Sequence, residues 1–100
     1  PDAVFVANDH MALAVMDTLR HELGLKIPDD VSIVGYDDVP AASWPSYLLT
    51  TVQQPVNIMV RETVEILIEK IDNAYARPQK IKIDGPLILR NSAKIQKGYI

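Results

Sequence analysis

The first third of the chain has the pattern of a strand, a helix and a second strand joined by short links. Residues 3–7 form a nearly continuous apolar run, which is typical of a strand buried on both faces. Residues 10–23 predict a helix, with Gly24 at the position of a left-handed C-terminal cap. Residues 31–36 predict a second strand, rich in β-branched side chains. A strand–helix–strand unit with short links places its strands parallel, so the sequence predicts an α/β fold around a parallel sheet.

The rest of the chain adds further short elements and one long helix. Residues 40–46 predict a loop with one helical turn, and residues 49–53 predict a third strand. Pro55 suits the first turn of a helix that we expect to end near residue 73. Residues 80–83 alternate polar and apolar side chains, and residues 87–89 predict a last strand. The long helix carries an apolar stripe made of Val56, Met59, Val60, Thr63, Val64, Leu67, Ile68 and Ile71.

Polar side chains follow the first three predicted strands at the point where each strand ends. Asn8 follows the first strand, Asp37 the second and Gln54 the third. Ligands of open α/β sheets bind at the carboxyl ends of parallel strands, so we expect these residues to line one rim. Two amides and a carboxylate offer donors and acceptors to several hydroxyl groups at once. The pattern predicts recognition of a polyol.

Each of these residues also has a purely structural interpretation. Asn8 or Asp9 can cap the first helix, and we expect the cap to be Asp9. Asp37 and Asp38 can form a solvated turn, which is our expectation for Asp38. Gln54 can simply precede the long helix. Only their common placement at three strand ends favours a binding site.

Composition and spacing give no sign of catalysis, a metal or a cofactor. The chain has no cysteine, which excludes disulfides and thiolate sites. His10 and His21 lie on different faces of their predicted helix, and the pair Asp37–Asp38 lacks a third group for acid–base work. Gly35 is not part of a glycine-rich motif that would bind phosphate. We therefore expect no enzyme, no metal and no cofactor.

Charge and hydropathy also limit the partners. The net charge is −3 with scattered Lys and Arg, so we expect no nucleic-acid-binding face on this chain. No apolar run approaches the roughly 18 residues of a membrane span, and no secretory signal is visible. Trp44 lies in a loop between Ser43 and Pro45, where it can stack on a sugar ring or anchor a subunit interface. We favour the interface.

Successive sequence blocks resemble the lactose/galactose repressor family, in order and in spacing, from Pro1 to about Ser92. The first block is PDAVFVAND at residues 1–9, and the second is IPDDVSIVGYDD at residues 27–38. The third is LTTVQQP at residues 49–55, and the last is LILRNS at residues 87–92. Residues 47–49 are Tyr-Leu-Leu where the family commonly has a Pro-Pro-Leu-Thr-Thr run, so we expect this loop to differ from that of the family.

The resemblance implies that this chain is the C-terminal part of a two-lobed effector domain like a periplasmic sugar-binding protein. Residues 1–54 and 86–92 then belong to the C-terminal lobe, and residues 55–80 to the other lobe. The family's helix-turn-helix DNA reader has no counterpart in this sequence. The resemblance implies effector contacts at Asn8, Asp37 and Gln54, and a homodimer interface at Leu13, Ser43, Trp44 and Pro45.

The expected function is effector sensing, with a sugar as effector, in a cytoplasmic transcription repressor that reaches operator DNA only through a separate N-terminal reader. A periplasmic sugar-binding protein of an uptake transporter is the alternative, and a sugar-modifying enzyme is a weaker third. We expect the helix over residues 55–73 to leave its apolar stripe exposed in this chain, which favours association.

Overall fold

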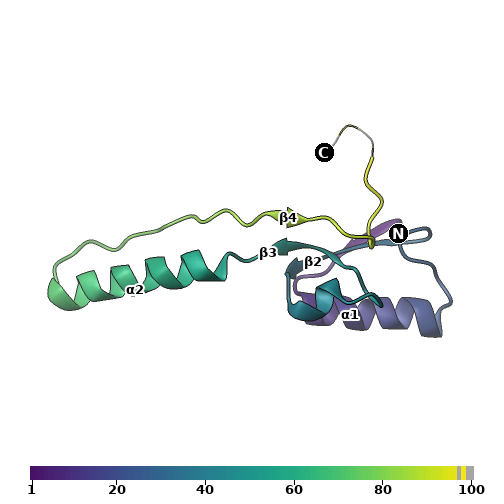
Figure 1. The fold of residues 1–100 in the computed structure, drawn as a ribbon, viewed down its shortest axis with the longest axis horizontal. Coiled ribbons are helices and arrows are strands. Elements are labelled where there is room, and N and C mark those ends of the chain that lie inside the picture. The colour runs from purple at the N-terminus through teal and green to yellow at the C-terminus, as the bar shows by residue number, and fades with distance from the viewer. Residues whose placement is uncertain (97, 99–100) are drawn as a thin grey trace. The chain divides into compact units, whose positions relative to one another are not determined.

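The computed structural model describes residues 1–96 and residue 98, and its chain divides into two compact units. The first unit runs from Pro1 to Gln54 and resumes at Pro86, and the second covers Pro55–Gly85. Figure 1 shows the elements of both units along the chain. Each unit is described below by itself.

A four-stranded sheet in the order β1-β2-β3-β4 forms the centre of the first unit. The strands are β1 (Ala3–Phe5), β2 (Ser32–Asp37), β3 (Thr50–Gln53) and β4 (Leu87–Ile88). β1 pairs parallel with β2, β2 pairs parallel with β3, and β4 pairs antiparallel with β3. The parallel α/β architecture expected from the sequence is confirmed, and the predicted strand ends are correct to within one or two residues.

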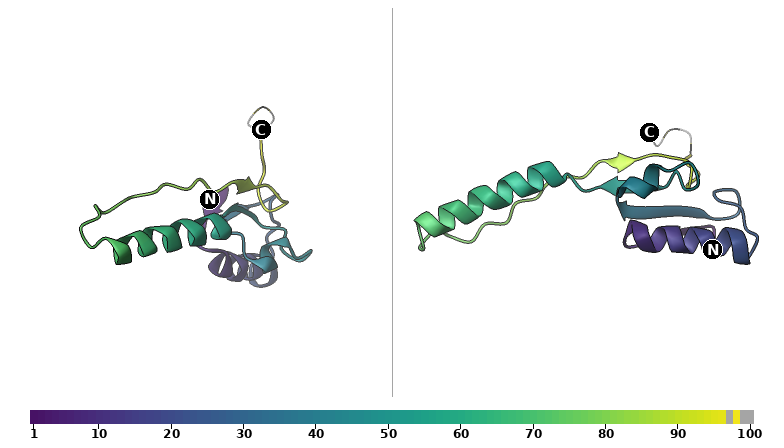
Figure 2. Two further views of the ribbon diagram at one scale, coloured as in Figure 1. Left: turned by 60° about the vertical axis from the view of Figure 1, so that its left-hand side comes forward. Right: turned by 60° about the horizontal axis from the view of Figure 1, so that its bottom comes forward.

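Helix α1 (Asp9–Asp17) follows β1 and packs against one face of the sheet, as the views in Figure 2 show. Its last turn widens into a π-helical segment, η1 (Thr18–Glu22), which the sequence did not predict. Gly24 has φ of +65°, the left-handed cap that the sequence predicted. Apolar side chains of the helix and strands meet in a small core made of Val6, Ala12, Met16, Val31, Ile33, Ala42 and Leu49.

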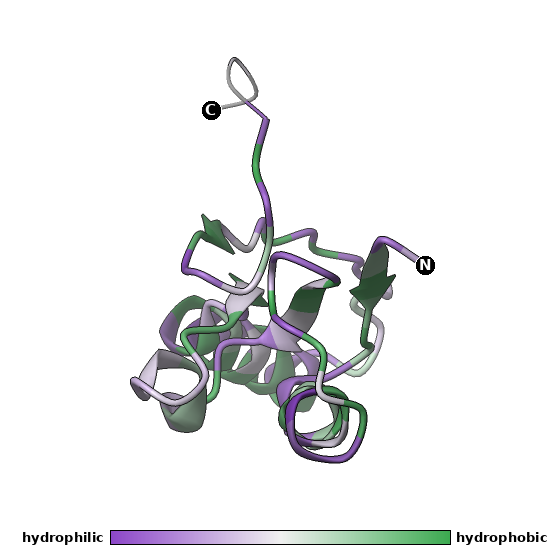
Figure 3. Cartoon of the chain, turned by 90° about the vertical axis from the view of Figure 1, so that its right-hand side faces the viewer, coloured by the Kyte–Doolittle hydropathy of each residue, from purple (hydrophilic) through white to green (hydrophobic). Residues whose placement is uncertain are grey.

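β1 lies at the edge of this sheet and is apolar along its length, as its green colour in Figure 3 shows. Phe5 at its end is 64% exposed, and Val4 packs partly against the core. A parallel strand of this composition is normally covered on both faces. The first unit therefore offers apolar surface at its β1 edge.

The segment after β4 is held to the sheet mainly through Ser92, which is buried. Its hydroxyl donates to the carbonyl of Ile33 at 2.6 Å and accepts from the amide of Thr50 at 2.8 Å. The amide of Ile33 donates in turn to the carbonyl of Ser92 at 2.7 Å. One serine therefore ties the returning chain to both β2 and β3.

The loop between β2 and β3 begins with a 3-10 turn, η2 (Pro40–Ser43), in agreement with the predicted helical turn. The rest of the loop is fastened to α1 and η1. The Tyr47 hydroxyl donates to Asp17 at 3.1 Å, and the Arg20 guanidinium donates to the carbonyl of Ser46 at 2.6 Å. These bonds fix the loop that carries Trp44.

The second unit consists mainly of helix α2 (Val56–Asp72), as the sequence predicted to within one residue at each end. No residue of α2 is buried, and Leu67, Ile68 and Ile71 are among its exposed apolar side chains. Residues 80–83 form no strand despite their alternation. Within the described part of the chain, no helix has both the length and the apolar character needed to cross a membrane.

Candidate ligand-binding site at the strand ends

The carboxyl ends of β1, β2 and β3 lie at one edge of the sheet because the three strands are parallel. Asn8 follows β1 after a short link, Asp37 is the last residue of β2, and Gln54 directly follows β3. The structure therefore places all three predicted residues at the expected edge. We call the side chains of Asn8, Asp37 and Gln54 the rim.

Asp37 and Gln54 are in direct contact. The side-chain amide nitrogen of Gln54 donates to Oδ1 of Asp37 at 2.5 Å, and both residues are half-buried. The backbones of the two residues are also in contact, since the backbone nitrogen of Gln54 lies 3.4 Å from the carbonyl oxygen of Asp37. This contact leaves Oδ2 of Asp37 and the side-chain carbonyl of Gln54 for other partners.

Asn8 caps helix α1. Its Oδ1 accepts from the amide of Met11 at 2.9 Å, and its own backbone is extended, as an N-cap requires. The structural interpretation of Asn8 is therefore confirmed, but the cap uses only the amide oxygen. The amide nitrogen takes no part in the cap and remains a donor at the rim.

Asp9 is not the cap that the sequence analysis expected. It is fully buried, its Oδ1 accepts from the Thr51 hydroxyl at 2.7 Å, and its Oδ2 accepts from the Val39 amide at 3.0 Å. The expectation failed because two neighbouring residues offered equivalent capping groups. Only the packing of α1 on the sheet decides which one points inward.

Asp38 is not the solvated turn residue that the sequence analysis expected. Its Oδ1 forms an ion pair with Arg90 at 2.7 Å, with 11% of its side chain exposed and 17% of that of Arg90. Oδ2 of Asp38 accepts from the side chain of Gln53 at 2.9 Å. Adjacent acids therefore bind adjacent amides, Asp37 with Gln54 and Asp38 with Gln53.

Arg90 is the residue beside the rim that sequence reasoning missed. Besides its ion pair, it donates from its guanidinium to the carbonyl of Leu49 at 2.9 Å and from its backbone amide to the Thr50 hydroxyl at 3.0 Å. It lies in the LILRNS block, so the block marked its importance but nothing nearby in sequence indicated its partner. Because Arg90 pairs with Asp38, Asp37 is the one of the two adjacent acids that has no ion pair among the described residues.

The rim residue Asp37 and its neighbour Asp38 have unusual backbones. Their φ angles are +137° and +59°, a region that side-chain-bearing residues rarely adopt and that Asp tolerates better than most. Such conformations persist only where surrounding contacts hold them. The turn that presents Asp37 is therefore fixed by its neighbours.

The residues expected at a dimer interface differ in exposure. Trp44 is 56% exposed and Pro45 is exposed, whereas Leu13 is half-buried against the core. Ser43 is exposed and donates from its hydroxyl to the carbonyl of Pro40 at 2.9 Å within η2. An exposed tryptophan in a loop held to α1 is compatible with an interface.

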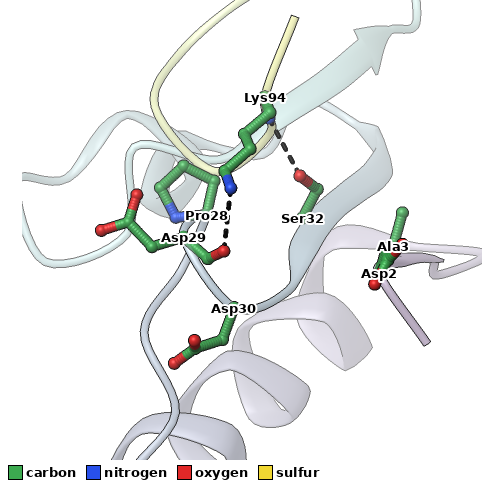
Figure 4. Close-up of a pocket in the computed structure, with 7 residues that line it drawn as sticks. All are labelled: Asp2, Ala3, Pro28, Asp29, Asp30, Ser32 and Lys94. Carbon is green, nitrogen blue, oxygen red and sulfur yellow. Dashed lines mark hydrogen bonds between the residues drawn. The ribbon is translucent and has the colours of Figure 1, made fainter.

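A pocket of about 400 Å³ lies at the opposite edge of the sheet, at the amino ends of β1 and β2 (Figure 4). Its polar groups already bind one another. The Lys94 ammonium group donates to the Asp29 carbonyl at 2.9 Å, and the Lys94 backbone amide donates to the Ser32 hydroxyl at 2.9 Å. The Asp30 carboxylate accepts from the Lys26 amide at 2.8 Å. The rim is therefore the stronger candidate site.

Among the described residues no group of three His, Cys, Asp or Glu side chains could hold a metal ion.

Comparison with known proteins identifies a family over nearly the whole chain. Residues 1–93 match the periplasmic binding protein-like domain. The HTH-type transcriptional repressor PurR of Vibrio campbellii is 38% identical over 94 residues, which is 94% of this chain and 28% of that protein. The chain thus spans just over a quarter of the length of this relative.

Solved structures agree with this similarity. A LacI-type transcription regulator from Bifidobacterium animalis has a TM-score of 0.85 and 35% identity, covering 95% of this chain and 34% of its own. A LacI family regulator from Enterococcus faecalis with bound ribose has a TM-score of 0.83 and 35% identity, covering 95% of this chain and 35% of its own. The chain belongs to the periplasmic binding protein-like domain family, in the form that regulators of the lactose/galactose repressor family carry as their effector-binding domain.

Proposed function

We propose that this chain is the effector-sensing part of a DNA-binding transcription regulator, and that a sugar binds at the rim of Asn8, Asp37 and Gln54. The observation that carries the proposal is the Asp37 carboxylate. It ends β2 in a fixed turn, is oriented by Gln54 and has no cation partner among the ion pairs of the described residues. Its second oxygen can accept from a ligand hydroxyl.

The groups that the rim retains fit a neutral, hydroxyl-rich ligand. Asp37 offers an acceptor oxygen, Gln54 a carbonyl oxygen and Asn8 an amide nitrogen, once the bonds within the protein are counted. Hydroxyl groups donate and accept, so one sugar ring can satisfy all three, and the charged acceptor strengthens its bond. The ribose bound to the Enterococcus faecalis regulator supports this ligand class.

The regulatory step is a shift between two lobe arrangements. In this proposal residues 1–54 and 86–92 belong to one lobe and residues 55–80 to the other. A sugar that binds one arrangement more tightly favours it, by no more than its difference in affinity for the two. Operator DNA is bound by a separate reader, and the regulator acts in the cytoplasm without catalysing a reaction.

The regulator also forms a homodimer in this proposal, through Leu13 and the loop of Ser43, Trp44 and Pro45. Exposed aromatic side chains are enriched at protein interfaces. Trp44 is exposed, and its loop is fastened to α1 and η1, so a partner would meet a preformed surface.

The relatives reported above are transcription regulators, which favours a regulator over a sugar-binding protein of an uptake transporter.

A thermal-shift screen of the full-length regulator against monosaccharides, disaccharides and purine bases tests the proposal. A ligand that binds only the folded state raises the Tm by mass action, about 2.7 kcal/mol of stabilisation at a concentration 100 times the Kd. Asp37→Ala should abolish the shift given by the best sugar. Asp29→Ala, an exposed acid at the opposite edge, should leave it unchanged.

Two results would contradict the proposal, the first its site and the second its ligand class. One is an Asp37→Ala protein that keeps both the Tm shift and the affinity for that sugar. The other is a screen in which purine bases, and no sugar, stabilise the wild-type protein, which would overturn the ligand class but not the regulator.

A further inference from the structure

Asp9 is a buried carboxylate that no ligand at the rim can touch. It begins α1, is 0% exposed, and reaches two separate parts of the fold with its two oxygens. One oxygen accepts from the Thr51 hydroxyl of β3 at 2.7 Å. The other accepts from the backbone amide of Val39, directly after the Asp37–Asp38 turn, at 3.0 Å.

The sheet is shaped to admit this carboxylate. A Cβ atom at Gly35 of β2 would lie 2.3 Å from Oδ1 of Asp9 and 2.9 Å from the Leu49 side chain. Neither distance is possible for real atoms, so only glycine leaves room for Asp9 between α1 and the sheet. Asp9 is thus fixed from the strand side by Gly35 and Thr51.

The Val39 contact bears on the rim because of the turn that precedes it. Asp37 and Asp38 both have positive φ, which stores strain that local contacts must hold. Within the turn, Asp38 is tied to Arg90 and Asp37 to Gln54. The Val39 amide is the point at which the end of the turn is tied to α1.

We propose that Asp9 is a positioning residue for effector binding, which holds the Asp37–Val39 turn through the Val39 amide and thereby sets the direction of the Asp37 carboxylate. This inference rests on the proposed function. If Asp9 only stabilised the fold, the loss of either of its bonds would weaken sugar binding. If Asp9 positions the turn, only the loss of the bond to the Val39 amide weakens it. The two bonds can be removed separately.

Three variants of the full-length regulator separate these roles. Asp9→Ala removes both bonds. Thr51→Val removes only the bond to β3. In Asp9→Asn the amide oxygen still accepts from Val39, while its nitrogen donates to the Thr51 hydroxyl.

Hydrogen exchange of the Val39 amide, measured without ligand, reports the turn directly. We expect exchange to become about tenfold faster or more in Asp9→Ala, and to stay within about threefold of wild type in Asp9→Asn and Thr51→Val. Affinity for the best sugar of the screen should follow the same order. It should fall about tenfold or more in Asp9→Ala, the scale of one lost bond to a charged group, and change by less than about threefold in the other two.

Several outcomes overturn the inference. A tenfold loss of affinity in Thr51→Val or in Asp9→Asn contradicts it, even where Asp9→Ala does not fold. Unchanged Val39 exchange in a folded Asp9→Ala contradicts it as well. If Asp37→Ala loses sugar binding while Asp9→Ala keeps it, only the positioning role fails. If no sugar binds the wild type, the proposed function fails, and Val39 exchange alone decides whether Asp9 holds the turn.

Discussion

At the residue scale, the neighbouring acids Asp37 and Asp38 have different environments. Asp38 forms an ion pair with Arg90 and accepts a hydrogen bond from Gln53, whereas Asp37 accepts a hydrogen bond from the neutral side chain of Gln54. A guanidinium neutralises the carboxylate that it pairs with, whereas a neutral amide donor does not. The surroundings, and not the residue type, therefore distinguish Asp37, which we propose to bind the ligand, from Asp38.

Arg90→Met is expected to destabilise the protein by about 2 kcal/mol, because it leaves the half-buried Asp38 carboxylate with one partner fewer and frees the Leu49 carbonyl. Urea unfolding of the full-length protein measures the loss. Arg61→Met, on the exposed surface of α2, should change the free energy of unfolding by less than about 0.5 kcal/mol.

A double-mutant cycle identifies the cause. Asp38→Asn in the Arg90→Met background should cost clearly less than Asp38→Asn alone, since the pair is then already broken. Strict additivity of the two changes would show that the Arg90 side chain stabilises the fold through the Leu49 carbonyl and its packing and not through Asp38.

At the element scale, the loop after η2 is held to α1 by a tyrosine. The hydrogen bond from Tyr47 to Asp17 is the largest cause that raises the pKa of Tyr47 above its ordinary value, with smaller contributions from burial and from the Asp17 charge. The phenol can donate only while it is protonated. The link therefore stabilises the loop below the ordinary tyrosine pKa and is lost as the pH rises through the raised pKa.

Asp17→Asn should lower the pKa of Tyr47 towards that of a free tyrosine, because it removes both the charged acceptor and its repulsion of the phenolate. An NMR titration of the tyrosine ring signals in alkaline solution measures it. Asp29→Asn serves as the control and should leave the titration unchanged, because Asp29 is exposed and is not among the groups that shift the pKa of Tyr47. A Tyr47 midpoint that does not move in Asp17→Asn would contradict the contact.

At the scale of the whole molecule, the exposed apolar side chains of α2 predict how this chain behaves in solution. The helix has no buried residue, and Val64, Leu67, Ile68 and Ile71 are all about half exposed or more. Monomeric soluble proteins rarely leave so continuous an apolar stripe in water. The stripe needs a partner that this chain by itself does not supply within the second unit.

The 100-residue chain alone should therefore associate in solution. Leu67→Lys should weaken the association by placing a charge on the stripe, whereas Glu65→Lys, on the polar side of α2, should leave it nearly unchanged. Sedimentation equilibrium over a range of concentrations distinguishes the two. A wild-type chain that sediments as a monomer and unfolds cooperatively would contradict the expectation.

The strand and helix pattern of the chain determined the elements. A nearly continuous apolar run indicates the strand at residues 3–7, and β-branched side chains indicate the strand at residues 31–36. An apolar stripe with a period of 3.6 residues indicates α2, and all three patterns are local properties of the sequence. The sequence also identified Asn8, Asp37 and Gln54 as strand-end residues. Residues 80–83 also alternate polar and apolar side chains but form no strand, because alternation indicates a strand only where a neighbouring strand exists to pair with it.

Only the tertiary structure decided the roles of individual polar residues. Asp9 and Asn8 are equivalent as caps in the sequence, and the close approach of α1 to Gly35 turned Asp9 inward. Asp38 forms its ion pair with Arg90, which lies 52 positions away in the sequence. Side-chain hydrogen bonds and ion pairs such as these depend on distances that folding creates between remote segments, whereas the apolar patterns that indicate helices and strands are local in the sequence.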